Sequence, residues 1–358
     1  MMGASKTTAA LSILKSAGAF RLANRATRTK LRILCYHGLW LGGTPQYGDC
    51  LYMQPQLFAA RMEWLARSPY PVLPLDEAIG HLDNGSLPDN AVAITIDDGW
   101  FSTLKGMVPV LERLGLPATL YATTYYSMRG GPVLNVLIDY LVSQAAPDAL
   151  GRSSYSRDLA ESHPGLPPHS VAARDAISRK LASAVDALPG DERLAAVREI
   201  AAMLGRDIDP ILEGRWFDLM SEEELREAHK RGLDIQLHTH THRMHGLAPE
   251  KVAAEIALNR QELARILGVA ASTLVHFCYP SGVHSLEVFD AVRRSGIRSA
   301  TTTESGLVQG TDERMSLSRI LDCQSMTLLE FEARLTGIWD MISAARRRAR
   351  PVKEAYAG

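Results

Sequence analysis

Residues 91–99 read AVAITIDDG. The first six are mostly apolar and rich in isoleucine and valine, and a run of this length and composition favours a buried strand over a helix. Asp97, Asp98 and Gly99 follow at once, and residues of these types end a strand in a turn. The stretch therefore predicts a core strand whose last two residues are adjacent carboxylates.

Similar apolar segments lie on both sides of this strand, with helical patterns between them. Strands are expected at residues 31–36, 118–122, 233–237, 274–278 and 299–302. Helices are expected at residues 55–67, 75–82, 104–114, 221–231, 249–267 and 286–295. Residues 71–75 are a further candidate strand. Alternation of strands and helices is typical of a parallel α/β sheet or barrel.

The alternation stops between residues 127 and 215, where the pattern is mostly helical. This segment contains a polar stretch rich in Ser, Pro and His at residues 151–169. We interpret it as a helical cap inserted into one catalytic domain that spans residues 31–340. Residues 1–30 then form an N-terminal leader, and residues 341–358 form a tail.

Both ends of the chain are basic although the net charge is only −1. That net charge gives no reason to expect nucleic acid as a partner. Residues 1–30 carry six Lys and Arg and no acidic residue, so they are either a solvated, frayed end or a basic segment on an anionic membrane surface. In the second case Leu11, Leu14 and Leu22 share an apolar side. The sequence carries no indication of oligomeric state.

The chain also contains four scattered cysteines, Cys35, Cys50, Cys278 and Cys323. They lack CxxC spacing, which favours free thiols in a reducing compartment. The N-terminus makes a poor signal peptide, and no apolar run is long enough to span a bilayer. The protein is therefore expected in the cytoplasm, where it could lie peripherally on the inner face of the membrane.

Two strand ends carry residues suited to hydrolytic chemistry. Asp97 and Asp98 point in different directions at the end of a strand, so one can bind a metal ion while the other acts as a base. They could equally be helix-capping aspartates. The sequence HTHTH at residues 238–242 follows another strand, and histidines four residues apart can bind one cation. One carboxylate and two imidazoles leave a coordination position open for water.

The third strand end, CYPSG at residues 278–282, is by itself only a turn. Together the three motifs resemble the polysaccharide deacetylase family, also called the NodB-homology domain or carbohydrate esterase family 4. TIDDG at residues 95–99 is similar to the family's T-F-D-D-G, and HTHTH is similar to H-[S/T]-x-x-H. CYPSG takes the place of R-x-P-x-G. Tyr36-His37 and LERLGLPAT at residues 111–119 also match segments common in the family.

This resemblance implies a distorted, incomplete (β/α) barrel of the polysaccharide deacetylase type with the helical cap inserted in it. It also implies that Asp98, His238 and His242 bind a divalent metal. Zinc is the first expectation, with cobalt, nickel and manganese as alternatives. Asp97 becomes the base that takes a proton from the metal-activated water. Trp100, Tyr279 and Pro280 are expected to contact the substrate.

The chain departs from the family pattern at two places. The arginine of motif three, which orients the catalytic aspartate, is Cys278 here. The late L-x-H motif, whose histidine protonates the leaving amine, is absent, and the corresponding region reads LSRI at residues 317–320. His37 is the preferred general acid, unless it only hydrogen-bonds within its loop. His240 and His284 are weaker candidates for this role. Asp234, Arg319 and Asp322 could lie near the site or simply pair with one another.

The function implied is metal-dependent hydrolysis of an N-acyl group, first of all N-acetyl, from an amino sugar. A cytoplasmic enzyme would act on a nucleotide-linked or lipid-linked glycan precursor, or on a small aminoglycoside-like molecule. The same site could instead remove a formyl group or open a cyclic amide. Loss of two family motifs could also mean a non-catalytic, metal-containing carbohydrate-binding protein.

Overall fold

The computed structural model describes residues 2–43, 46–146, 149–150 and 170–342. The chain divides into two compact units. The first consists of Met1–Leu39, Gly48–Tyr125 and Glu222–Gly358, and the second consists of Trp40–Tyr47 and Tyr126–Ser221. The predicted tail, residues 341–358, lies outside the described residues from 343 onward.

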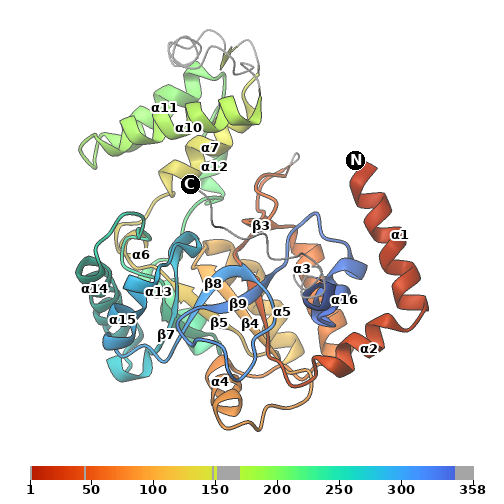
Figure 1. Cartoon of the computed structure of the whole chain (residues 1–358). Coiled ribbons are helices and arrows are strands. Elements are labelled where there is room, and N and C mark those ends of the chain that lie inside the picture. The colour runs from red at the N-terminus through yellow and green to blue at the C-terminus, as the bar shows by residue number, and fades with distance from the viewer. Residues whose placement is uncertain (1, 44–45, 147–148, 151–169, 343–358) are drawn as a thin grey trace, which may run out of the picture. The chain divides into compact units, whose positions relative to one another are not determined.

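The first unit is built on a closed barrel of seven parallel strands (Figure 1). The strands are, in their order around the barrel, β1 (Arg32–Tyr36), β4 (Val92–Asp98), β5 (Thr119–Ala122), β6 (Asp234–Leu237), β7 (His276–Cys278), β8 (Ser299–Ser305) and β9 (Leu317–Leu321). Pairing of Leu34 in β1 with Ile320 in β9 closes the ring. The predicted (β/α) barrel is confirmed, with one strand fewer than a regular eight-stranded barrel.

Helices of the first unit cover the barrel because the strands are apolar on both faces. All seven residues of β4 are buried, as expected for a strand packed inside and outside a parallel barrel. The helices are α3 (Pro55–Arg67), α4 (Leu75–Asp83), α5 (Val108–Leu114), α13 (Glu222–Lys230), α14 (Pro249–Leu267) and α15 (Leu286–Arg294). Leu75 and Ile79 of α4, for example, pack with Ile33 and Ala93 of the barrel. Each such Leu or Ile contributes roughly 1.5–3 kcal/mol by its burial.

Two strand assignments differ from the sequence-based expectation. Residues 71–75 form only an isolated bridge between Val72 and Val92. Pro71 and Pro74 bracket this segment and lack the N–H that a longer ladder requires. By contrast, β9 was not predicted, and its alternation is interrupted by the buried, charged Arg319. A short two-stranded sheet, β2 (Gly38–Leu39) with β3 (Tyr52–Met53), lies outside the barrel.

The leader folds onto the last described helix of the barrel unit. It forms α1 (Met2–Ser16) and α2 (Ala19–Ala26), and Leu11 and Phe20 pack with Ala333 of α16 (Leu328–Leu335). The interpretation as a frayed end is therefore wrong over these residues. Leu22 is 69% exposed, so it does not share a side with Leu11. The membrane contact predicted for residues 1–30 stays a prediction. Of the apolar side proposed for it, Leu11 and Leu14 instead pack against other residues of the protein.

The second unit is helical. It contains α7 (Leu134–Gln144), α10 (Val171–Asp186), α11 (Arg193–Met203) and α12 (Asp209–Glu213), and α10 runs beside α7 (Figure 1). Aromatic residues from separate segments join its core, and Trp40 packs edge-on against Trp216. Tyr47 donates a hydrogen bond to Asp139 of α7 at 2.5 Å.

The cysteines differ from the prediction. Cys50 and Cys323 form a disulfide, so the expectation that all four remain free thiols is wrong. The two residues are 273 positions apart, and only closure of the barrel brings β9 and its following segment beside the start of the chain. Disulfides are typical of oxidising compartments, which removes the cysteine argument for the cytoplasm. Cys35 and Cys278 are free and buried.

Among the helices that the structure describes, none combines the length and the apolar character needed to cross a bilayer.

Candidate active site

The chemically notable residues lie where the barrel strands end. Asp97 and Asp98 are the last residues of β4, His37 and His238 follow β1 and β6, and Cys278 ends β7. Since the strands are parallel, their carboxyl ends meet at one mouth of the barrel. The chain bends sharply there. Six described residues other than glycine have a positive φ, and four of them belong to the three motifs: Asp98, Thr239, His242 and Ser281.

Asp98, His238 and His242 converge on one point. Oδ1 of Asp98 lies 3.2 Å from Nε2 of His238 and 3.1 Å from Nε2 of His242. His238 and Asp98 are buried, whereas the side chain of His242 is 34% exposed. The group is therefore fixed from inside the barrel and accessible from the His242 side.

Neighbouring groups fix the orientation of both buried ligand candidates. Nδ1 of His238 donates to the carbonyl oxygen of Cys278 at 2.8 Å, which leaves its Nε2 facing Asp98. Nε1 of Trp100 donates to Oδ2 of Asp98 at 2.7 Å. Burial raises the pKa of Asp98, but hydrogen bonds from His238 and His242 outweigh it and hold the pKa well below its usual range. The carboxylate is thus ionised and aimed at the two imidazoles.

These residues fit a divalent metal ion. Nδ1 of His238 donates to a carbonyl oxygen, so its Nε2 meets the Asp98 carboxylate either as a second N–H or as a lone pair directed at a shared cation. Donor atoms about 2.0–2.2 Å from a shared tetrahedral zinc lie roughly 3.3 Å apart. The observed separations of 3.1 and 3.2 Å are close to that value.

Asp97, the neighbouring carboxylate, has a different set of partners. Its Oδ1 and Oδ2 each accept a hydrogen bond of 2.7 Å from the two terminal nitrogens of Arg319. Burial raises the pKa of Asp97, but the Arg319 guanidinium outweighs it and lowers the pKa to about 2. Bidentate pairing of this kind fixes the plane of the carboxylate as well as its charge.

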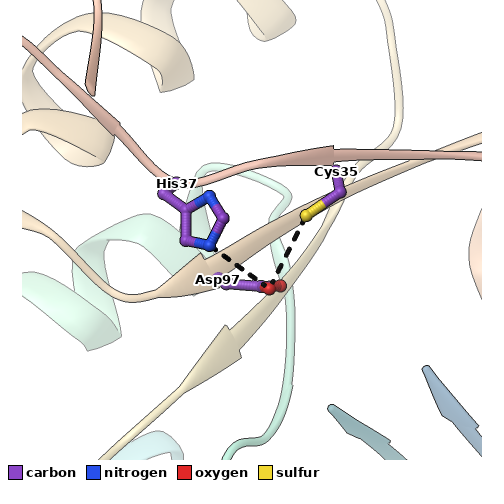
Figure 2. A group of neighbouring side chains, drawn as sticks. All are labelled: Cys35, His37 and Asp97. Carbon is purple, nitrogen blue, oxygen red and sulfur yellow. Dashed lines mark hydrogen bonds and ion pairs between the residues drawn. The ribbon is translucent and has the colours of Figure 1, made fainter. Parts of the chain in front are cut away.

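Three further side chains approach Oδ2 of Asp97. The thiols of Cys278 and Cys35 lie 3.4 and 3.7 Å away, and Nε2 of His37 lies 3.8 Å away. Figure 2 shows His37 and Cys35 reaching Asp97 from the same strand segment. Cys35, His37 and Asp97 are close enough to share a cation. That alternative is disfavoured because Arg319 already occupies both carboxylate oxygens and burial raises the pKa of the Cys35 thiol well above its usual range.

The three predicted substrate contacts lie at different depths. Trp100 is 3% exposed and packs on Tyr52, so its indole serves Asp98 rather than an open surface. Tyr279 is buried against Phe277, and burial raises the pKa of its phenol. Pro280 lines a pocket. This pocket measures about 240 Å³ and is bounded by His242, Arg243, Met244, His245, Pro280, Ser281 and Val283.

Of the remaining candidates only Arg319 reaches the carboxylates. His240 pairs with Thr124 at 2.8 Å, and His284 lies 3.6 Å from Glu304. Asp234 accepts from Thr119, and Asp322 accepts from Tyr36 and Arg61. The sequence did contain a signal for Arg319, because LSR at residues 317–319 stands where the family has L-x-H.

Comparisons with known proteins point to the family that the motifs resemble. The family model described as polysaccharide deacetylase matches residues 198–300, which include the second and third motifs. "Putative polysaccharide deacetylase YxkH" of Bacillus subtilis (strain 168) is 33% identical over 93 residues, or 26% of this chain. The match covers 31% of that protein, so the chain spans about a third of this relative's length.

Three solved structures share the fold over most of this chain. The Streptococcus pyogenes deacetylase PplD, in complex with acetate, has a TM-score of 0.56 at 16% identity, covering 86% of this chain and 99% of its own. IcaB from Ammonifex degensii has a TM-score of 0.51 at 17% identity, covering 86% and 97%. The de-N-acetylase from Aggregatibacter actinomycetemcomitans has a TM-score of 0.51 at 14% identity, covering 85% and 99%. The family resemblance is therefore confirmed as a similarity to polysaccharide deacetylases over residues 198–300, together with a shared fold over most of the chain.

Proposed function

We propose that this protein hydrolyses the N-acyl group, first of all N-acetyl, of an amino sugar in a metal-dependent reaction. The observation that carries the proposal is the convergence of Asp98, His238 and His242 within 3.2 Å beside a separately held second carboxylate, Asp97. The relatives support the substrate class, since the matched family model and curated relative describe polysaccharide deacetylases.

Asp98, His238 and His242 would hold the cation, with zinc the first choice for one carboxylate and two imidazoles. When bound, it supplies Lewis acidity that polarises the acyl carbonyl and lowers the pKa of a water. The partly exposed His242 lies on the side from which substrate would approach, next to the pocket that Pro280 lines.

In this proposal Asp97 would act as the general base. Its carboxylate is ionised and held in one plane by Arg319, so it can accept a proton from the attacking water without first losing one. Arg319 takes up two of its lone pairs, and the remaining ones face the thiols and His37. Proton transfer to a positioned carboxylate contributes typically about 10²–10⁴-fold to a rate.

In this proposal His37 would protonate the leaving amine. Its Nε2 lies 3.8 Å from Oδ2 of Asp97, close enough for both groups to act on one substrate bond. Its Nδ1 is buried and has no hydrogen-bond partner among the residues that the structure describes. In the balanced reaction one water is consumed and a carboxylate and an ammonium group are released. Asp97 would take a proton from the water, His37 would give one to the leaving nitrogen, the carboxylic acid product would pass its proton to the amine, and the proton on Asp97 would return to His37.

The test combines metal content with release of the acyl group. We expect about one divalent metal ion per chain and chelator-sensitive acetate release from a panel of N-acetylated sugar nucleotides and lipid-linked oligosaccharides. Asp97→Asn should abolish release and keep the metal, because the amide cannot act as a base. Asp234→Asn is the matched control, since Asp234 bonds to Thr119 and Gln236 at the start of β6.

The other outcomes separate the alternatives. Formate release or opening of a cyclic amide, with acetate absent, would replace the acetyl group in the proposal. Glycan binding that survives Asp97→Asn, with no turnover by the wild type, would favour a binding protein. Protein that takes up no metal after reconstitution would overturn the proposal itself.

A further inference from the structure

Cys278 and Arg319 contact each other at the point where the guanidinium meets Asp97. The Cys278 sulfur lies 3.2 Å from Nη2 of Arg319 and 3.4 Å from Oδ2 of Asp97. Cys278 is on β7, at the position where the polysaccharide deacetylase family has arginine, and Arg319 is on β9. Both side chains are fully buried, so a larger residue at position 278 would compete with Arg319 for the same space.

We propose that Arg319 is the positioning residue for Asp97, and that Cys278 and Arg319 are an exchangeable pair: the small thiol on β7 makes room for an arginine supplied by β9. This inference rests on the proposed function for the part that concerns catalysis. The exchange of the two residues can be tested on the folded protein alone.

The contacts of Arg319 leave it little freedom. Its Nε donates to the carbonyl oxygen of Thr302 on β8 at 2.8 Å, and its Nη1 donates to Thr95 on β4 at 3.2 Å. The two bonds to Asp97, also on β4, and the contact with Cys278 on β7 spread its hydrogen bonding over three other barrel strands. A planar fork with donors on several sides is specific to arginine, and lysine cannot reproduce it. The orientation of Asp97 is thus set by the barrel rather than by a loop.

A role in stability alone is the competing explanation. Breaking a buried ion pair destabilises a protein strongly, because the remaining charge has lost its partner. Loss of activity in a single Arg319 variant would therefore be ambiguous. The two explanations differ in what an added guanidinium ion or a relocated arginine can restore.

The first measurement compares kcat and KM. Arg319→Ala should lower kcat about 10²-fold with little change in KM and with metal content kept, since Asp97 loses its orientation while the substrate and metal positions stay. Added guanidinium chloride should restore part of kcat at millimolar concentration, whereas sodium chloride should not. Arg319→Lys should stay well below the wild type because its single ammonium cannot bind both oxygens.

The second measurement is a thermal double-mutant cycle that requires no activity. Arg319→Ser and Cys278→Arg should each lower Tm by about 5–10 °C, the first by leaving Asp97 unpaired and the second by crowding two guanidinium groups. The double variant carries its arginine on β7 and should regain at least half of that loss. Cys278→Ser is the matched control for removal of the thiol.

Each possible result of these two measurements tests one part of the proposal. Additive losses of Tm in the double variant would overturn the exchangeable pair, whatever the activity. An active wild type whose Arg319→Ala variant keeps its kcat, or recovers nothing with guanidinium, would overturn the positioning role. An inactive wild type with the expected Tm cycle would overturn the proposed function and leave the exchange established.

Discussion

Asp97 and Asp98 are adjacent in the sequence, yet the barrel gives them opposite surroundings. Asp97 faces the guanidinium cation of Arg319, the thiols of Cys35 and Cys278, and His37. Asp98 turns with a φ of 74° toward His238 and His242, whose rings can bind a metal ion. The guanidinium of Arg319 already balances the charge of the Asp97 carboxylate, which makes Asp97 a poorer metal ligand than Asp98. In the proposed function, this one strand end would provide both a metal ligand and a base.

A third buried aspartate shows what the geometry of the Arg319 pair contributes. Asp322 receives one contact of 3.2 Å from Nε of Arg61 and one from the Tyr36 hydroxyl, and its Oδ1 has no partner among the described residues. Burial raises the pKa of Asp322 to about 6 in spite of Arg61. The two hydrogen bonds of 2.7 Å from Arg319 thus lower the pKa of Asp97, whereas the single longer contact from Arg61 does not keep the pKa of Asp322 from rising.

The largest expected effect concerns the Asp97 side. His37→Gln should lower kcat about 10²–10³-fold on an N-acetyl substrate and hardly change it on 4-nitrophenyl acetate, because only the amine must be protonated to leave. Steady-state kinetics on both substrates measures this. His81→Gln is a control, since His81 lies on α4 and contacts Ser86. If the His37 variant lost its metal ion, His37 would act with Asp98 in metal binding, and the proposed separation of the Asp97 and Asp98 roles would be contradicted.

An intermediate effect is expected on the Asp98 side. Trp100→Phe removes the indole N–H that Asp98 accepts, so metal affinity should fall about 10–100-fold while KM at saturating metal stays unchanged. Competition with a chromogenic chelator gives the affinity. Trp64→Phe, on α3, where the indole packs against Phe331, is the matched control. A raised KM at unchanged metal affinity would instead support Trp100 as a substrate contact, as the resemblance implied.

Substitution of Asp322 is expected to change activity least of all. Its effect on the free energy of unfolding is expected to depend on pH. Its folded pKa of about 6 exceeds the unfolded value of 3.8, so the folded state binds the extra proton between these values. The stability of the wild type relative to Asp322→Asn should therefore be greatest below pH 4 and fall by about 3 kcal/mol as the pH rises to 7. Urea unfolding at several pH values measures this, with Asp89→Asn as an exposed control. A rise instead of a fall would mean that Arg61 keeps Asp322 ionised, as Arg319 keeps Asp97.

The sequence by itself determined the elements that depend on local patterns. The apolar run before Asp97 and the alternation of strands and helices predicted a parallel barrel, and residues 32–36, 92–98 and 119–122 are strands close to the expected positions. The three motifs predicted which residues to examine, because turns after parallel strands meet at one end of a barrel. The roles assigned to Asp97, Asp98, His37, His238 and His242 stay predictions.

Only the tertiary structure decided which distant residues became partners. Arg319 pairs with Asp97 across 222 positions, and Cys50 bonds to Cys323 across 273. The leader packs on α16, and Trp100 lies beneath the surface rather than on it. No periodicity or spacing reports such pairs, because they arise from closure of the barrel between β1 and β9. Hydrophobic patterns record which face of an element is buried, and the ring closure alone determines what that face meets.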